Sequence, residues 1–321
     1  MADTGRQDFT GEVINNGEFK LAEKLGKGAF GDVYKVEAIS GPHKGKTFAA
    51  KIEQNLDPDN PVDQLYAETK MYLWLNNKEE SVNHAVPEVY SYGQHAQPEF
   101  KFMVMDLLGK SLEDLFAAQQ RQFSLKTTIS IAVQVIPIFK FVHENRLLHR
   151  DIKPDNFAVG YGDKSNKIYL LDFGLAKRFQ APVRDGGIRH IEPADNKPLV
   201  GTPRYVSINT HDKGEHSRKD DMIGLSYMFL YFLKGSLPWQ GKKELSADEK
   251  IEHMKNVKKQ MHQTPDILFQ GVPKVFKDFY LKVNALGFTD KPNYDEYVND
   301  FMNLYRKLGF GQNLDYKYDW S

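Results

Sequence analysis

Hydrophobic and polar residues alternate along the first third of the chain in short runs that predict β-strands. Three runs, FKLAEKLG, DVYKVEAI and KTFAAKIE, extend from Phe19 to roughly Ile52 and are separated by turns that contain glycine. Residues 65–75 then carry apolar side chains at helical spacing, and a further strand pair is indicated at 89–92 and 102–107. The pattern predicts a unit of five strands and one helix that ends near residue 108.

Long helical periodicities replace the strands after this point. They cover about 112–120, 125–144, 217–234, 248–261, 272–286 and 293–307. We therefore expect an α+β fold with two lobes, a small β-rich lobe at about 19–108 and a larger, mainly helical lobe at about 109–308. Residues 1–18 are polar and rich in glycine, and they are predicted to form a loose N-terminal arm. Residues 309–321 are predicted to form a short C-terminal extension.

Composition narrows the range of partners. The 321 residues suit two domains or one two-lobed unit, and 43 basic residues balance 43 acidic ones. Because the net charge is zero, no overall field attracts nucleic acid or an anionic membrane, and we expect neither as a partner. The most apolar stretch, Met222–Leu233, is too short for a membrane span, which needs about 20 residues. We expect a monomer of the cytosol or the nucleus.

The chain contains no cysteine. Disulfide bonds, zinc sites built on thiolates and cysteine nucleophiles are therefore excluded together. Any nucleophile, base or metal ligand must come from oxygen and nitrogen groups. The candidate functional groups are therefore carboxylates, amides, lysines and the backbone of glycine-rich turns.

The first candidate for chemistry is the glycine-rich segment GKGAFGDV, Gly26 to Val33, between two predicted strands. These glycines are equally consistent with an ordinary hairpin. A dinucleotide-binding motif would lead into a helix, whereas a strand follows here. Glycines in a turn between strands let backbone N–H groups approach phosphate oxygens without a Cβ atom in the way.

Two charged residues follow the glycine segment. Lys51 lies on the third predicted strand, within FAAK, and Glu68 lies among apolar residues on the predicted helix. A strand lysine is usually a solvated edge charge, but one that follows a glycine loop is able to reach phosphates. A carboxylate on a core-facing helix either extends to solvent or pairs with a cation, and Lys51 is the natural partner.

The strongest motif is HRDIKPDNF, His149 to Phe157, followed by LLDFG at 170–174. Asp151, Asn156 and Asp172 supply hard oxygen atoms of the kind that Mg²⁺ prefers when it also binds substrate phosphates. A polar loop of this composition is sometimes mere surface. Nine specified residues in one order make that interpretation improbable.

These residues resemble the signature set of a eukaryotic protein kinase domain, over about Phe19 to Leu308. The resemblance implies the bilobal kinase fold, with ATP in the cleft between the lobes and Mg²⁺ as its metal. It further implies a role for each matching residue. Gly26, Gly28 and Gly31 would cover the ATP phosphates, and Lys51, held by Glu68, would contact these phosphates. Asp151 would accept the proton of the substrate hydroxyl, and Lys153 would approach the transferred phosphate, as in serine/threonine kinases. Asn156 and Asp172 would bind Mg²⁺, and the adenine would be surrounded by Leu25, Val33, Ala49, Met105 and Leu108.

Longer strings are similar to the casein kinase 1 family. They are MVMDLLGKSLEDLF at 103–116, GTPRYVSINTH at 201–211 and SRKDDMIGLSYMFLYFLKGSLPWQG at 217–241. This resemblance implies a serine/threonine kinase for protein substrates that are acidic or already phosphorylated about three positions before the target. Arg204 and Lys250 match positions that the family uses to hold such an anion, although both are also consistent with ordinary surface cations.

Other interpretations and departures from the family pattern stay open. A pseudokinase is disfavoured because the charged set is intact, and a small-molecule kinase is disfavoured by the strings at 201–211. Ser226 stands where the family has glycine, Ala158 stands where it has leucine, and the loop at 55–62 is long. We expect activity without an upstream kinase. The cations around the activation segment, which are Lys177, Arg178, Arg184 and Arg189, suit either a bound phosphate or solvent.

Overall fold

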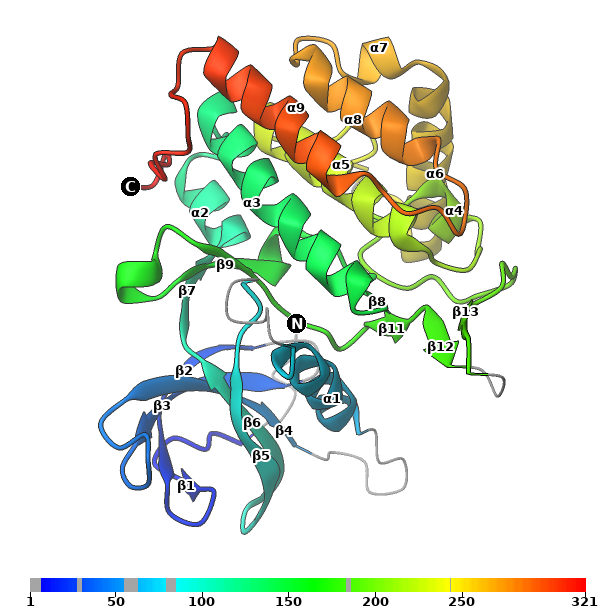
Figure 1. Ribbon diagram of the computed structural model, residues 1–321. Helices are drawn as coiled ribbons and strands as arrows, with labels where there is room; N and C mark the ends of the chain where they lie inside the picture. The colour runs from blue at the N-terminus through cyan, green and yellow to red at the C-terminus, as the bar shows by residue number, and fades with distance from the viewer. Residues whose placement is uncertain (1–6, 28–30, 55–62, 79–84, 183–185, 243) are drawn as a thin grey trace. The chain divides into compact units, whose positions relative to one another are not determined.

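The structure is a computed structural model that describes residues 7–27, 31–54, 63–78, 85–182, 186–242 and 244–321. The chain forms two compact units, which Figure 1 shows as a sheet-based and a helical part. The first unit comprises residues 1–109, 160–165 and 171–174, and the second comprises 110–159, 166–170 and 175–321. The predicted α+β fold, with a β-rich and a helical part, is confirmed.

The described residues of the first unit form a six-stranded antiparallel sheet and one α-helix, α1 (Gln64–Asn76). The strand order is β1-β2-β3-β4-β6-β5, and every neighbouring pair is antiparallel. Five of the strands and the helix were expected from the sequence. The strands are β1 (Val13–Ile14), β2 (Phe19–Lys27), β3 (Asp32–Ala38), β4 (Thr47–Glu53), β5 (Val89–Ala96) and β6 (Glu99–Asp106).

The two faces of this sheet have different partners. Tyr34, Ala50 and Val104 lie opposite one another on β3, β4 and β6 and belong to a buried apolar cluster. Side chains alternate between faces along a strand, so Lys51 and its cross-strand partner Met103 point the other way. Thr69 of α1 donates to the sulfur of Met103, so α1 covers this second face.

The N-terminal arm is not loose where the structure describes it. Phe9 and Ile14 are buried in the apolar cluster of the sheet, and β1 pairs with β2. The ring of Phe9 lies 4.4 Å from that of Phe100, and its N–H group donates to the hydroxyl of Tyr34 at 3.2 Å. The prediction was wrong because the polar, glycine-rich composition concealed two apolar residues that cover the end of the cluster.

The second unit is mainly helical. Figure 1 shows α3, α5, α8 and α9 running alongside one another, and α3 contacts both α5 and α9. The predicted helices are confirmed to within a few residues. The helices are α2 (Leu112–Ala118), α3 (Leu125–Glu144), α4 (Ile208–His211), α5 (Arg218–Lys234), α6 (Ala247–Gln263), α7 (Pro265–Leu268), α8 (Lys274–Asn284) and α9 (Tyr294–Lys307).

Short strands connect these helices and position the loops between them. β8 (Leu147–Leu148) pairs with β11 (Lys177–Arg178), β9 (Phe157–Gly160) with β10 (Ile168–Leu170), and β12 (Gln180–Pro182) with β13 (Ile188–His190). β7 (Leu108–Ser111) lies where the chain passes from the first unit to the second. The HRDIKPDNF motif therefore lies in the loop between β8 and β9.

Helix α3 is the most apolar of the described helices. It is long and apolar enough to cross a membrane by length and composition alone, but 67% of its most apolar window is buried inside the structure. A core helix passes the same test. The contacts with α5 and α9 account for its apolar surface as packing within the second unit.

The C-terminal extension folds back on the start of α3. Asp319 accepts a hydrogen bond from the Ser124 N–H group at 2.6 Å, and Asp315 pairs with Lys126 at 2.5 Å. The rings of Tyr318 and Trp320 stack at 4.6 Å. Residues 315–320 therefore cap α3 and belong to the packed structure of this unit.

Candidate active site

Three charged residues of the first unit lie together. Lys51 on β4 places its Nζ atom 2.6 Å from Glu68 Oε2 on α1 and 3.7 Å from Asp172 Oδ1. The side chains of Lys51 and Glu68 are only 13% and 4% exposed. Tyr72, one turn after Glu68, accepts a hydrogen bond from the Asp172 N–H group at 2.9 Å. The helix thus fixes both the lysine and the aspartate.

Burial and charge act against each other in this group. Burial alone would lower the pKa of Lys51, but the carboxylates of Glu68 and Asp172 raise it above its ordinary value. Burial raises the pKa of Glu68 to about 7, against the opposing effect of Lys51. Lys51 therefore stays cationic, while the charge of Glu68 is sensitive to pH near neutrality.

The predicted adenine residues share the sheet face that carries Lys51. Val33 lies opposite Lys51, and Ala49 lies opposite Met105. Cross-strand partners project to the same face, as do residues two apart on one strand, so these four side chains lie on one surface. Of the remaining predicted residues, Leu25 and Gly26 end β2 and are exposed, Leu108 begins β7 and is half-buried, and Gly28 lies outside the described residues.

Gly31 has a specific reason to be glycine. A Cβ atom at this position would lie 2.2 Å from the carbonyl oxygen of Ile52. No side chain fits there, so the glycine allows β3 to begin directly against the end of β4. This close approach fixes one end of the glycine-rich segment.

Asp151 is the centre of the site in the second unit. Its Oδ2 atom accepts from Lys153 at 2.6 Å and from the Asn156 amide at 3.1 Å, and its Oδ1 atom accepts from Thr202 at 2.7 Å. Burial would raise the pKa of Asp151, but the hydrogen bonds and charge of Lys153 and the bond from Thr202 lower it below its ordinary value. The carboxylate is therefore ionised and held in one orientation.

Two aspartates at the start of α5 hold the surrounding loops. Asp221 is fully buried and accepts from the backbone N–H groups of His149 and Arg150, each at 2.9 Å. Its neighbour Asp220 accepts from the hydroxyl of Ser207 at 2.6 Å. The adjacent carboxylates thus anchor the loop that carries Asp151 and the segment that follows Thr202.

The family comparison agrees with this geometry. A model of the protein kinase domain matches residues 19–301. The chain belongs to the protein kinase family. It is therefore a phosphotransferase that acts on proteins. Kinases of this family use ATP and divalent metal ions.

The donor atoms at two positions suit the metal of a kinase. Asn156 uses its amide nitrogen to donate to Asp151, which leaves its carbonyl oxygen as an acceptor. Asp172 is 32% exposed, and its Oδ1 atom accepts from the Gly174 N–H group at 3.2 Å. An amide oxygen and an accessible carboxylate are hard ligands of the kind that Mg²⁺ binds. Each of the two residues thus offers an oxygen atom that suits the metal.

Gly224 of α5 lies against the loop that carries Asp151. A Cβ atom at this position would lie 2.9 Å from the Cβ atom of Ile152, the neighbour of Asp151. The glycine lets the kinase loop pack directly against the helix. Ser226 is buried, and its hydroxyl donates to the carbonyl of Ile223 at 2.7 Å, so the helix accommodates it without an unpaired polar group.

Arg204 and Lys250, the predicted anion ligands, line one cavity of about 370 Å³. Neither has a carboxylate within 4.0 Å in the described parts of the chain. The guanidinium of Arg204 lies 5.6 Å from the ring centre of Tyr205 and 5.5 Å from that of Tyr231. The other lining residues are Trp239, Gln240, Gly241, Lys242, His253 and Met254.

The activation-segment cations have different environments. Lys177 pairs with the buried carboxylate of Glu215 at 2.7 Å, and Lys197 reaches the same oxygen at 3.5 Å. Arg189 is exposed on β13, and Arg184 lies outside the described residues. An internal carboxylate therefore neutralises Lys177.

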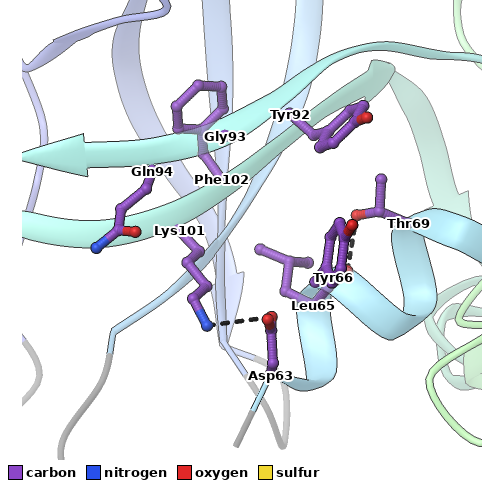
Figure 2. Close-up of a pocket in the computed structure, with 9 residues that line it drawn as sticks. All are labelled: Asp63, Leu65, Tyr66, Thr69, Tyr92, Gly93, Gln94, Lys101 and Phe102. Carbon is purple, nitrogen blue, oxygen red and sulfur yellow. Dashed lines mark hydrogen bonds and ion pairs between the residues drawn. The ribbon is translucent and has the colours of Figure 1, made fainter. Parts of the chain in front are cut away.

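A separate pocket of about 220 Å³ lies in the first unit, between α1 and the strands β5 and β6 (Figure 2). Leu65, Tyr66 and Thr69 of the helix face Tyr92 of β5. Lys101 and Asp63 form an ion pair of 3.1 Å at its edge. None of the predicted ATP-site residues lines this pocket.

Several residues that shape the site were not singled out from the sequence. Thr202 contacts Asp151 from 51 positions away, and Tyr72 contacts Asp172 from 100 positions away. In the sequence, Tyr72 is consistent with one more core-facing residue of the predicted helix. Asp221 carried a weak signal, because two adjacent aspartates at the start of an apolar helix suggest either a cap or an anchor for a loop.

Proposed function

We propose that this kinase is an ATP- and Mg²⁺-dependent serine/threonine kinase of casein kinase 1 type, which phosphorylates acidic or already phosphorylated proteins. The observation that carries the catalytic part is the set of contacts around Asp151. Lys153 and Thr202 hold the two carboxylate oxygens from opposite sides at 2.6 and 2.7 Å. A lysine two residues after the base is the feature by which this site resembles the serine/threonine branch.

The chain's own residues suggest the following mechanism. The substrate hydroxyl donates a hydrogen bond to Asp151, its oxygen forms a bond to the γ-phosphorus, and the bond to the leaving ADP oxygen breaks. The hydroxyl proton passes to Asp151. Lys153 and Lys51 supply positive charge for the phosphoryl oxygens. Asn156 and Asp172 would hold Mg²⁺, which would supply further positive charge.

Asp151 suits a role in orienting the hydroxyl. Its pKa is lowered, so it is a weak base in the ground state and gains a proton only as the hydroxyl loses its own during transfer. The hydrogen bonds from Lys153 and Thr202 fix the direction of its free lone pairs. Positioning therefore contributes more than basicity, as expected for phosphoryl transfer.

The cavity at Arg204 and Lys250 supports the substrate preference. Two cations without a nearby carboxylate, together with Lys242, line a space of about 370 Å³. A phosphate carries up to two negative charges and accepts several charge-assisted hydrogen bonds, whereas a carboxylate carries one charge. The cavity is therefore better matched to a phosphorylated residue than to an acidic one.

The catalytic assignment is tested by transfer of labelled phosphate from ATP to peptides that differ only in a serine, threonine or tyrosine acceptor. We expect transfer to serine and threonine only. Asp172→Asn should lower kcat by at least about 10²-fold, because it removes a preorganised charge. Efficient transfer to tyrosine, or full activity of Asp172→Asn, would contradict the assignment.

The anion assignment is tested with Arg204→Gln and Lys250→Gln. Each should raise KM for a peptide with phosphoserine three positions before its acceptor and leave KM for ATP unchanged. Lys259→Gln is the matched control, because Lys259 lies on the same helix as Lys250 but pairs with Asp212 at 2.8 Å. Equal KM values in all three variants would show that the cavity does not bind the substrate anion.

A further inference from the structure

Lys258 is a buried lysine that the mechanism above does not use. It lies on α6, its side chain is about 1% exposed, and no carboxylate of the described residues lies within 4.0 Å of its amine. Lysine is almost never fully buried unless it is paired. The Lys258 amine therefore needs protein partners that replace the water molecules it loses on burial.

The partners are backbone carbonyls of the segment Pro203–Val206. The Nζ atom of Lys258 donates to Pro203 O at 2.8 Å and to Val206 O at 2.7 Å. It also lies 3.1 Å from Nε2 of His211. One amine thus binds the first and the last residue of a four-residue segment, and Arg204 lies between these two residues.

Trp239 completes this arrangement. Its Nε1–H group donates to the carbonyl of Arg204 at 2.8 Å, so three of the four carbonyls in the segment have a donor from α6 or from the loop before it. The Lys258 amine lies 5.2 Å from the Trp239 ring centre and 5.1 Å from that of Tyr227. Burial lowers the pKa of the Lys258 amine well below its ordinary value, and the two aromatic faces act in the opposite direction because they favour a cation. We call Lys258 and Trp239 the carbonyl clamp.

The charge state of the neighbouring histidine is consistent with this role. Burial and the adjacent Lys258 lower the pKa of His211 to about 3, so the imidazole is neutral at physiological pH. Its Nε2 atom lies 3.2 Å from Pro203 O and 3.1 Å from the Lys258 amine. A neutral ring places no second cation beside Lys258.

The clamped segment carries two residues of the site. Thr202, directly before it, donates to Asp151, and Arg204 within it lines the cavity assigned to the substrate anion. The N–H groups of Tyr205 and Val206 both donate to the carbonyl of Thr202, at 2.9 and 3.2 Å, which makes the segment a compact turn. Fixing its carbonyls therefore fixes the direction from which Arg204 reaches the anion.

We propose that the carbonyl clamp is a positioning device that sets the geometry of Pro203–Val206 and thereby the preference of this kinase for substrates with a phosphorylated residue. The proposal rests on the function proposed above for Arg204. Lys258 is a positioning residue and does not touch the substrate. Removing its amine leaves the Val206 carbonyl without its donor and leaves the Pro203 carbonyl with only the His211 ring nearby, so the segment must move to hydrate the freed carbonyl.

The test compares Lys258→Met with the wild type on paired peptides, with and without phosphoserine three positions before the acceptor. We expect the ratio of kcat/KM for the two peptides to fall about tenfold, the effect of one charge-assisted hydrogen bond, while KM for ATP is unchanged. Lys258→Arg keeps N–H donors and should retain most of the ratio. A merely structural loss would lower the rates on both peptides equally, and an unchanged ratio would overturn the proposal.

Lys234→Met is the matched control. Lys234 also donates to a backbone carbonyl, that of Leu268 at 2.8 Å, but this contact lies outside the clamped segment. In Lys234→Met the ratio of kcat/KM for the two peptides should equal that of the wild type. A ratio that falls equally in Lys234→Met would show a general effect of losing a lysine and would contradict the clamp.

Hydrogen exchange separates failure of the clamp from failure of the proposed function. In Lys258→Met the amides of Tyr205 and Val206 should exchange faster than in the wild type, whatever the substrate preference of the enzyme. If Lys258→Met does not fold, Trp239→Phe, which removes only the donor to Arg204, should show the same change at these amides. Unchanged exchange in the variant that folds would overturn the clamp, even if the wild type prefers phosphorylated peptides.

Discussion

At the scale of single residues, the site depends on a few short contacts between buried charges. Lys51 and Glu68 lie 2.6 Å apart in the first unit, and Lys153 and Asp151 lie 2.6 Å apart in the second. The two pairs differ in their response to pH. The pKa of Asp151 is lowered, whereas burial raises that of Glu68 to about 7. Glu68 is therefore the residue through which mild acid affects the site.

We predict that kcat/KM for ATP falls as the pH drops from 8 to 6, because protonated Glu68 no longer holds Lys51 by charge. Glu68→Gln, which mimics the protonated form, should have low activity and lack this dependence. The measurement is a pH profile of both proteins with one peptide substrate. A profile of the wild type that is flat between pH 6 and 8 would contradict the assignment.

The effect of Glu68 on stability has the opposite direction to its effect on activity. Its pKa is higher in the folded protein than the ordinary value of 4.5, so the folded state binds the proton more tightly. The contribution of Glu68 to the free energy of unfolding is fully present below pH 4.5 and is lost as the pH rises through about 7. Mild acid thus weakens catalysis through this residue without weakening the fold through it.

At the scale of elements, the start of α5 organises the second unit. Asp221 accepts from the N–H groups of His149 and Arg150 and lies 2.9 Å from the buried ring of His143. Burial would raise the pKa of Asp221, but His143 and the hydrogen bonds lower it, so the carboxylate is ionised. One helix end therefore carries the charge that shapes the loop of Asp151.

We expect Asp221→Asn to lower the free energy of unfolding by about 3 kcal/mol, because it breaks a buried charged network. Activity should fall with it, since the loop of Asp151 loses its anchor. Urea unfolding and kcat of the same preparation measure the two effects. Asp319→Asn is a control, because that carboxylate also accepts from a backbone N–H group, at the exposed N-terminus of α3. Equal losses in both variants would contradict a special role for α5.

The sequence predicted most of the elements and the charged residues, because both leave local patterns. Alternation and helical spacing identified the sheet, α1 and the long helices, and fixed motif spacing identified Asp151 and Lys51. Contacts that join distant segments left no such pattern. Thr202, Tyr72 and Lys258 became visible only through the fold, since an isolated threonine, tyrosine or lysine is typical of many surfaces and cores.

The prediction of a loose N-terminal arm was wrong for a different reason. A polar average over residues 1–18 concealed Phe9 and Ile14, which the sheet buries. Composition describes a segment as a whole, whereas docking requires only one or two apolar side chains with a matching surface. The C-terminal extension shows the same principle, because Tyr318 is buried within a largely exposed segment.

At the scale of the whole molecule, each unit contains its own part of the proposed catalytic machinery. The first unit contributes Lys51, Glu68 and Asp172, and the second contributes Asp151 and Asn156. The proposed substrate cavity and the carbonyl clamp both belong to the second unit. We therefore expect that variants at Arg204 or Lys258 change the use of peptides, whereas variants at Lys51 or Glu68 change the use of ATP.

We also expect activity without an upstream kinase, which would be a property of the whole molecule. Glu215 already neutralises Lys177 and lies near Lys197, so no added phosphate is needed to balance these cations. We predict that protein treated with a phosphatase keeps its activity, and that Glu215→Gln loses part of it. The assay uses the same peptide before and after treatment. Protein that becomes inactive on dephosphorylation would contradict this prediction.

We propose that this kinase transfers phosphate to serine or threonine and binds a nearby anion on its substrate. The most direct measurement is kcat/KM of the wild type for two serine peptides that differ only in a phosphoserine three positions before the acceptor. We predict that kcat/KM is about tenfold higher or more for the phosphorylated peptide, because at least one additional charge-assisted hydrogen bond forms. Equal kcat/KM values for the two peptides would contradict it.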